Sequence, residues 1–285
     1  MEIINRIPKM ISIGRELRAE GRRVGLVPTM GALHQGHLSL VDRAVSICDK
    51  VVVSVFVNPL QFGPTEDYER YPRDLARDAE LAFTRGVDII FAPAADEMFP
   101  PDFGAYVKVD RLADRLEGAS RPGHFIGVAT VVAKLFNIVH PNFAFFGRKD
   151  AQQTILIKQM VRDLSMDVEV VVCPIVREAD GLAISSRNQY LSPDQRPAAV
   201  VLRRALERCR SLYNAGERDC TRLIQAMMSI LGNEPLARVD YVAITDTREL
   251  QPLGVISSDT PALVSIAVRI GETRLIDNIV LNGDL

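Results

Sequence analysis

The chain has 285 residues, of which 47% are hydrophobic and 25% are charged, and its formal net charge is -2. This is ordinary globular composition, and a chain of this length buries roughly three quarters of its unfolded surface, enough for one large domain or two smaller ones. The small net charge gives no reason to expect nucleic acid as the main partner, although a local basic pocket for a small anion stays open.

The sequence favours a cytoplasmic protein with reduced thiols and no membrane partner. Its N-terminal segment lacks the long apolar core of a signal peptide, and no uncharged apolar run reaches the roughly 20 residues of a membrane span. Its cysteines are expected to be small buried side chains, since their spacing fits neither a metal site nor a CxxC pair: Cys48, Cys173, Cys209 and Cys220.

Helical and strand-like segments alternate over the first part of the chain. The residue periodicity predicts, in order, helix 10–21, strand 22–29, helix 37–49, strand 50–58, helix 73–86, strand 87–93, helix 127–140, strand 142–147, helix 150–164 and strand 166–176. Residues 51–57 are all β-branched or aromatic apart from one serine, which is typical of a parallel strand buried on both faces. Together they predict an α/β fold with a doubly wound parallel sheet.

The pattern changes after about residue 176. A helical segment covers residues 192–216, with Ser192 as the expected N-cap and Pro193 at the first helical position. The sequence then predicts a second helix and three strands, at residues 220–233, 239–246, 261–271 and 273–283. We therefore expect a Rossmann-like domain over residues 1–175 and a smaller C-terminal α+β domain over residues 176–285.

Residues 28–41, PTMGALHQGHLSLV, place two of the four histidines three residues apart. They follow a predicted strand, so His34 and His37 fall near the N-terminus of the next helix, at the sheet edge where doubly wound proteins bind ligands. A helix N-terminus favours anions, and residues three apart share one helix face. Gly36 would let the backbone approach a phosphate closely. The pattern points to phosphoryl or nucleotidyl chemistry.

Other interpretations of the two histidines stay open. They could form a solvated helix start, or a metal site with His124 and His140, although no nearby acidic residue or cysteine completes such a set. The GxxxxGK[ST] phosphate loop and the GxGxxG dinucleotide fingerprint are both absent from the sequence. A nucleotide site in this chain must therefore use other means.

Five segments in this order resemble the pantothenate synthetase family, which shares its HxGH motif with nucleotidylyltransferases related to class I aminoacyl-tRNA synthetases. They are PTMGALHQGHLSLV, FVNPLQFGPTEDYERYPRD, RPGHFIGVATVVAKLFNIVHP, FFGRKDAQQ and VREADGLAISSRNQYLS. The resemblance covers residues 23–195. It implies that ATP converts pantoate to pantoyl adenylate and pyrophosphate, and that β-alanine then displaces AMP to give pantothenate. The pocket would have to keep water from the reactive anhydride.

The resemblance also implies an ATP site. His37 would be the proton donor of the transition state, with His34, Lys149 and Arg187 as further catalytic groups around the phosphates. The implied ATP contacts are Met30, Gly31, Ala32, Leu33, His34, Gln35, Gly36, His37, Gly147, Arg148, Lys149, Asp150, Val176, Ile184, Ser185, Ser186 and Arg187. Magnesium would accompany the ATP, held mainly by its phosphates rather than by a protein cage.

Three positions of the implied ATP site need comment. Arg148 replaces the family's usual glutamate in GEKD, and we expect it to point outward. Ile184 replaces a common methionine or leucine, which is a mild change. Asp150 could cap the following helix, contact ribose or approach the magnesium ion.

For the acid substrate the resemblance implies four pantoate contacts: Gln61, Gln153, Tyr71 and Arg121. Gln61 would also contact β-alanine. Gln152 lies one step round the helix from Gln153 and should point elsewhere.

The resemblance further implies a homodimer and an active site over which the second domain closes as a lid. Two other function classes stay open. A different nucleotidyltransferase would lack the Gln61 and Gln153 pair and ignore β-alanine, and a non-catalytic nucleotide-binding module would not need His34, His37, Lys149 and Arg187 together.

Overall fold

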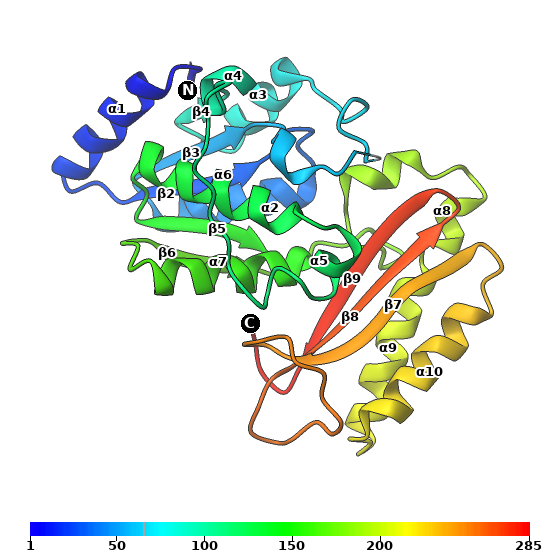
Figure 1. The fold of residues 1–285 in the computed structure, drawn as a ribbon. Coiled ribbons are helices and arrows are strands. Elements are labelled where there is room, and N and C mark those ends of the chain that lie inside the picture. Colours follow the sequence, from blue (N-terminus) through cyan, green and yellow to red (C-terminus); the bar gives the residue numbers. More distant parts are fainter. Residues whose placement is uncertain (65) are drawn as a thin grey trace. The chain divides into compact units, whose positions relative to one another are not determined.

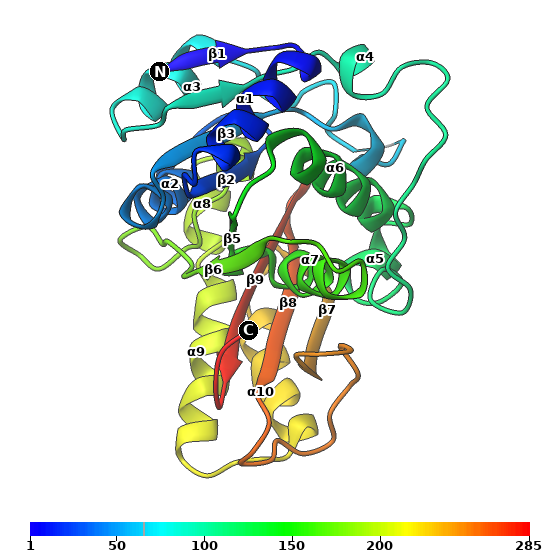
Figure 2. The ribbon, with the colours of Figure 1, turned by 90° about the vertical axis from the view of Figure 1, so that its left-hand side faces the viewer.

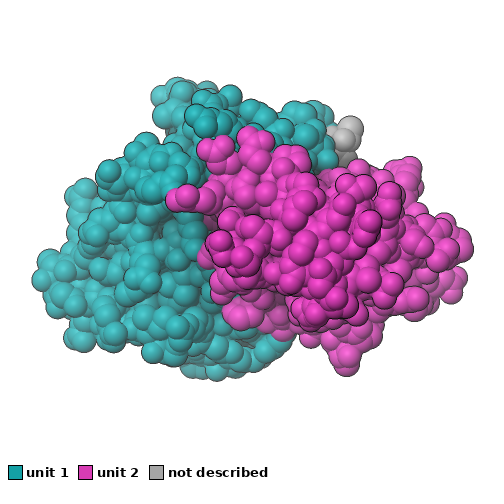
Figure 3. All heavy atoms as spheres, turned by 90° about the horizontal axis from the view of Figure 1, so that it is seen from below, with its two compact units in different colours: residues 1–147, 156–173 teal, residues 148–155, 174–285 magenta. Residues whose placement is uncertain are grey.

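The computed structural model describes residues 1–64 and 66–285. Thr65, in the second of the five segments, lies outside the described residues. The chain divides into two compact units, which Figure 3 colours separately: residues 1–147 with 156–173, and residues 148–155 with 174–285. Helix α7 (Ala151–Asp163) contributes residues to both units. The expected domain boundary after residue 175 and the lid role of the second domain remain predictions.

The first unit is built on a six-stranded sheet in the order β1-β4-β3-β2-β5-β6, with all pairs parallel (Figure 1). Its strands are β1 (Glu2–Ile4), β2 (Val24–Thr29), β3 (Lys50–Val55), β4 (Ile89–Phe91), β5 (Phe143–Gly147) and β6 (Glu169–Cys173). This confirms the predicted doubly wound, Rossmann-like fold. The strand order reverses between β2 and β5, the position at which such sheets bind ligands.

Helices cover both faces of this sheet (Figure 2). Helix α2 packs on β2, β3 and β5, whereas α1 and α6 pack against each other and on β2. The helices and the short 3₁₀ turn of this part are α1 (Ile7–Ala19), α2 (Gln35–Ile47), η1 (Pro59–Gln61), α3 (Leu75–Phe83), α4 (Ala95–Met98), α5 (Glu117–Ser120) and α6 (His124–Val139). Because both faces of β2 and β3 are covered, their apolar runs are buried almost throughout.

The second unit contains a three-stranded antiparallel sheet in the order β7-β8-β9. Two amphipathic helices, α9 and α10, pack on it, and the central strand β8 is buried along nearly its whole length. Its elements are η2 (Arg148–Asp150), η3 (Ser186–Tyr190), α8 (Gln195–Ala198), α9 (Val201–Asn214), α10 (Cys220–Gly232), β7 (Ala237–Asp246), β8 (Ala262–Ile270) and β9 (Thr273–Leu281). This confirms the predicted α+β part.

Two local predictions need correction. The helix expected from Pro193 begins at Gln195, because Pro197 has no backbone N–H to donate to the Pro193 carbonyl, and it ends at Ala198, so that α9 from Val201 is a separate helix. The Ser192 hydroxyl still accepts from the Gln195 N–H at 3.3 Å, so it caps this turn as predicted. Strand β1 was not predicted, since it is a three-residue edge strand with Ile3 exposed. None of the helices in residues 1–64 and 66–285 has the length and apolarity that a bilayer crossing demands.

Candidate active site

The turn between β2 and α2 is shaped by Asp78 of α3. Its buried carboxylate accepts hydrogen bonds from the backbone N–H groups of Ala32, at 3.0 Å, and Leu33, at 2.7 Å. Gly31 and Ala32 both have positive φ, +85° and +50°, and a Cβ at Gly31 would lie 2.9 Å from Asp78 Oδ2. Burial raises the pKa of Asp78, and the two N–H donors oppose that shift. Sequence reasoning missed Asp78, although an aspartate four residues before the buried Ala82 on one helix face was the available signal.

This turn brings His34 and His37 together at the N-terminal end of α2. Their rings are stacked, with centroids 4.0 Å apart and planes 16° from parallel. His34 is the N-cap residue, and its backbone N–H donates to His37 Nδ1 at 3.4 Å. Since Nδ1 accepts this hydrogen bond, neutral His37 carries its proton on Nε2. The ring can therefore present an N–H donor from the atom opposite the turn.

Met30 and Gln61 also meet in the first unit. The Gln61 amide nitrogen lies 2.9 Å from Met30 Sδ, and its Oε1 accepts from the Asn58 side chain at 3.0 Å. Asn58 is buried, donates to the Gly127 carbonyl at 3.1 Å and caps η1 by accepting from the Leu60 N–H at 3.1 Å. Asn58, which sequence reasoning did not single out, therefore fixes the orientation of the Gln61 side chain.

Arg121 is engaged by groups of its own chain. Its guanidinium meets the Glu66 carboxylate in a fork, with Nε–Oε1 at 2.6 Å and Nη2–Oε2 at 2.7 Å. Nη2 also donates to the Gln61 carbonyl at 3.3 Å, and Nη1 lies 3.0 Å from His124 Nε2. Tyr71 is buried, and its ring centroid lies 6.0 Å from that of Phe62. The direct role of Arg121 in binding pantoate remains a prediction.

His124 completes this network in a defined tautomer. Its Nδ1 lies 2.8 Å from the Gln61 carbonyl oxygen, which can only accept, so Nδ1 carries the proton. Nε2 then accepts from Arg121. Burial lowers the pKa of His124 to about 4, with the charge of Arg121 as the second cause. The ring is therefore neutral at pH 7 and links Arg121 to the backbone of Gln61.

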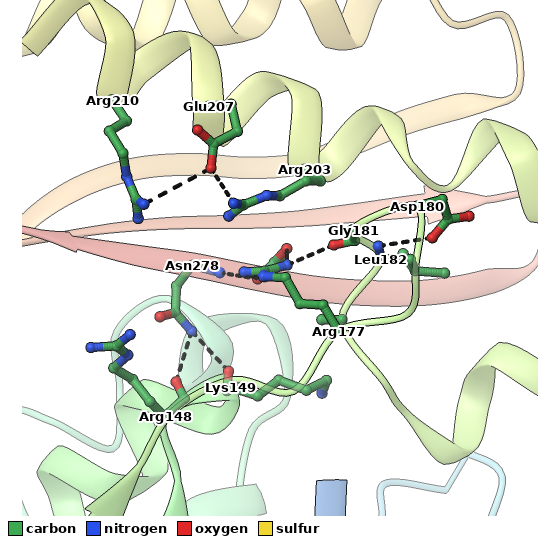
Figure 4. A network of polar contacts seen from close by, with 12 residues as sticks. Arg148, Lys149, Arg177, Asp180, Gly181, Leu182, Arg203, Glu207, Arg210 and Asn278 are labelled. Carbon is green, nitrogen blue, oxygen red and sulfur yellow. Dashed lines mark hydrogen bonds and ion pairs between the residues drawn. The ribbon is translucent and has the colours of Figure 1, made fainter. Parts of the chain in front are cut away.

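In the second unit, the η2 turn carries Lys149. Its ammonium lies 3.6 Å from the Asp150 carboxylate. Arg148 pairs with the exposed Asp284 at 2.8 Å, and Figure 4 shows its side chain directed away from that of Lys149. On α7, Gln152 is buried whereas Gln153 is partly exposed, so the two amides differ in environment.

Residues 176–188 fold into a hairpin followed by a 3₁₀ turn. The Ile184 N–H donates to the Val176 carbonyl at 3.0 Å, and Gly181 turns the hairpin with φ +91°. The Ser185 hydroxyl accepts from the Arg187 N–H at 3.3 Å and caps η3. The hairpin thus places Ser185, Ser186 and Arg187 in one short turn.

Each unit assembles its own share of the predicted site residues. His34, His37, Met30, Gln61 and Arg121 belong to the first unit, and Lys149, Gln153, Val176 and the 184–187 turn to the second. That these residues surround one triphosphate remains a prediction. Within the described ranges 1–64 and 66–285, no three or more His, Cys, Asp or Glu side chains are arranged to hold a metal ion.

The doubly wound sheet and the stacked rings of His34 and His37 after β2 agree with the nucleotide-dependent HxGH class of enzymes that the sequence resembles. The family model for pantoate-beta-alanine ligase matches residues 2–280. The chain is 57% identical over 281 residues to the pantothenate synthetase of Pelotomaculum thermopropionicum, covering 99% of each chain. It belongs to the pantoate-beta-alanine ligase family and is an enzyme of that activity.

Solved structures agree with this assignment. The pantothenate synthetase of Thermus thermophilus is 50% identical, with a TM-score of 0.90 over 98% of this chain and 99% of that one. The pantoate-beta-alanine ligase of Francisella tularensis, solved in complex with beta-gamma ATP and beta-alanine, is 35% identical. Its TM-score is 0.79, with 98% of this chain and 97% of that one covered.

Proposed function

We propose that the enzyme works through a pantoyl-adenylate intermediate. A pantoate carboxylate oxygen attacks the α-phosphorus of ATP, the bond between the α-phosphorus and its bridging oxygen breaks, and pyrophosphate leaves. The amine of β-alanine then attacks the acyl carbon, the acyl–oxygen bond to AMP breaks, and the amine gives up a proton. Pantothenate and AMP are the products.

The orientation of His37 is the observation that carries this proposal. Its Nδ1 accepts from the His34 N–H, so the ring proton lies on Nε2, from which it can be donated to a phosphate oxygen at a helix N-terminus. A donor fixed in this way stabilises charge that grows on the phosphate in the transition state. His34, Lys149 and Arg187 are proposed to share the remaining phosphate charge, as catalytic groups of the same site.

The rest of the proposed ATP site comes from three segments. These are residues 30–37, the turn at 147–150, and Val176 with residues 184–187. The Francisella tularensis pantoate-beta-alanine ligase is complexed with beta-gamma ATP and beta-alanine, which supports ATP as a substrate here.

Magnesium is proposed to accompany ATP. Asp150 fits this role because its carboxylate is about half exposed and adjoins the Lys149 ammonium at 3.6 Å. Magnesium is usually bound by one or two carboxylates together with substrate phosphates and water. When bound, the ion would neutralise phosphate charge, while Lys149 would orient the same phosphates.

Pantoate is proposed to bind through Gln61, Gln153, Tyr71 and Arg121, with Gln61 also contacting β-alanine. Asn58 fixes the Gln61 amide, which supports a role in orienting a substrate hydroxyl or carboxylate. For Arg121 to bind the pantoate carboxylate in a fork through Nε and Nη2, the substrate must replace Glu66. We further propose a cytoplasmic homodimer with no membrane or nucleic-acid partner.

Product analysis tests the proposed chemistry. The purified protein is incubated with ATP, magnesium, pantoate and β-alanine, and AMP, pyrophosphate and pantothenate are measured. Pantoate alone should give pyrophosphate exchange into ATP, and AMP release should require both acids. Pyrophosphate exchange that is independent of pantoate, or ADP as the product, would overturn the proposed intermediate. Light scattering of the purified protein at known concentration tests the dimer.

A further inference from the structure

Two adjacent polar residues interrupt the apolar strand β9. Asp277 and Asn278 are each only 3% exposed, in a strand whose other buried residues include Ile279 and Leu281. Burying a carboxylate or an amide is unfavourable unless its polar atoms are bonded. Their bonds therefore indicate what the two residues do.

Asn278 binds the backbone of the turn that carries Lys149. Its side-chain nitrogen donates to the carbonyl oxygens of Arg148 and Lys149, at 2.9 Å each (Figure 4). Both N–H groups of the amide are used in this way. Two consecutive carbonyls held by one rigid strand fix the peptide planes from which the Lys149 side chain projects.

Asp277 binds the start of the hairpin that leads to Arg187. Its carboxylate meets Arg177 in a fork, with Oδ2–Nη1 at 2.6 Å and Oδ1–Nη2 at 2.9 Å. Arg177 also donates to the Gly181 carbonyl at 3.0 Å, so one side chain spans the hairpin (Figure 4). A bidentate pair of this kind restricts orientation as well as distance.

The hairpin in turn fixes the position of the η3 turn, which carries Arg187. Asn188, next to Arg187, donates to the Ala183 carbonyl and to Glu178 Oε1, at 3.0 Å each. The η3 turn is thereby tied to both strands of the hairpin. All of these contacts lie within the second unit, residues 148–155 and 174–285.

We infer that Asp277 and Asn278 are positioning residues that fix the spacing between Lys149 and Arg187, so that both cations can meet the phosphates of one ATP. The part of the inference that brings both cations to one ATP rests on the proposed function. The contacts by which Asp277 and Asn278 hold the two segments do not depend on it. Lysine has a long flexible side chain, so its placement depends strongly on its backbone. Misplacing such a group by about 1 Å can lower turnover by about 10²-fold.

Kinetics of matched variants test the inference. Asn278→Ala should lower kcat for AMP formation by about ten- to a hundredfold, with a smaller change in the KM for pantoate. Asn282→Ala is the control, since the Asn282 amide likewise donates to backbone carbonyls, those of Ser257, Ser258 and Thr260, at 3.2, 2.5 and 3.4 Å. The control should keep its turnover, whatever stability it loses, because Asn282 lies outside the segments that carry Lys149 and Arg187. Equal losses of turnover in the two variants would overturn the inference.

A double-mutant cycle separates positioning from a general structural role. Because Asn278 acts through Lys149, adding Asn278→Ala to Lys149→Ala should change kcat by less than about threefold, whereas independent effects would multiply. The same cycle applies to Asp277→Asn with Arg187→Ala. If Asp277→Asn does not fold, Arg177→Lys replaces it, which keeps the charge and loses the fork. Multiplicative effects in both cycles would overturn the inference.

Hydrogen exchange tests the holding contacts of Asp277 and Asn278 independently of the proposed reaction. Asn278→Ala should speed amide exchange in residues 148–155 and leave 177–188 near the wild-type rate, and Asp277→Asn should do the reverse. Wild-type protein that forms no AMP would overturn the proposed reaction, yet this exchange pattern would still decide whether each residue holds its own segment. Faster exchange throughout the second unit in both variants would overturn the holding role.

Discussion

Arg121 and Glu66, 55 residues apart in sequence, form a forked ion pair at 2.6 and 2.7 Å, and the same guanidinium reaches the Gln61 carbonyl. The loop that carries the proposed pantoate contact is thus held by the C-cap residue of α5, just before α6 begins at His124. A lysine at position 121 could keep one of these contacts but not the fork.

Arg121→Lys is therefore expected to raise the KM for pantoate about tenfold, a cost of about 1.4 kcal/mol, while the KM for ATP changes less than about threefold. Steady-state kinetics with each substrate varied in turn measure this. Arg85→Lys is the control, because Arg85 pairs with Asp42 at 2.7 Å on the surface of the same unit. Equal increases in both KM values would contradict the assignment of this network to the acid substrate.

His124 should make the stability of the protein fall at acid pH. Its pKa in the folded state is about 4, below the ordinary value of about 6.5, so the unfolded chain binds a proton in this interval and the folded chain does not. Above about pH 6.5, His124 therefore does not lower the unfolding free energy. As pH falls to about 4, the unfolding free energy decreases by roughly 3 kcal/mol. Arg121, Glu66 and Glu117 are the charged groups that act on the ring.

Denaturant unfolding between about pH 4 and pH 7 measures this slope. His124→Asn retains a donor for the Gln61 carbonyl and cannot titrate. The slope of its unfolding free energy against pH should therefore be smaller, by the equivalent of up to about one bound proton. His140→Asn is a comparison variant rather than a neutral control: burial also lowers the pKa of His140, so this residue adds to the same pH dependence, and asparagine tolerates the positive φ of 52° at that position. If the unfolding free energy of His124→Asn depends on pH as strongly as that of the wild type, the His124 ring is not buried in its neutral form.

His37→Ala is expected to lower the rate of adenylation by about 10²–10³ and to weaken ATP binding far less, since a donor aimed at developing charge acts mainly in the transition state. Pyrophosphate exchange measures the first quantity and calorimetric titration with ATP the second. Equal losses in rate and affinity would contradict this role. His140→Asn, at the C-cap of α6, should leave both values close to those of the wild type.

Gly127→Ala tests the close packing between α6 and η1. A Cβ at Gly127 would lie 2.2 Å from the Leu60 carbonyl oxygen and 2.6 Å from the Gln61 nitrogen, both backbone atoms that cannot rotate away. We expect a loss of about 1–3 kcal/mol in unfolding free energy and a raised KM for pantoate. Gly232→Ala has nothing within 4 Å and should be neutral or slightly stabilising. A fully stable Gly127→Ala with unchanged kinetics would show that α6 does not set the Gln61 turn.

Periodicity alone identified most of the strands and helices of the doubly wound sheet. Apolar runs such as Val51–Val53 are buried on both faces wherever the sheet is covered by helices, so burial leaves a local signal in the sequence. The same signal fails for β1, which is short and mostly exposed, and for α8 and α9, which are separate helices where one continuous helix was expected.

By itself, the sequence determined the fold class, the family and the HxGH turn at the end of β2, because each depends on residues close together along the chain. Only the tertiary structure decided which partner several buried charges and amides bind. Asp78 on the Ala32 and Leu33 amides and Glu66 on Arg121 join residues about 45 to 55 positions apart, and Asn278 reaches back about 130 positions to Lys149. Such pairings are fixed by the cost of leaving a polar group unbonded in the interior, and that cost depends on the packed neighbours rather than on local sequence.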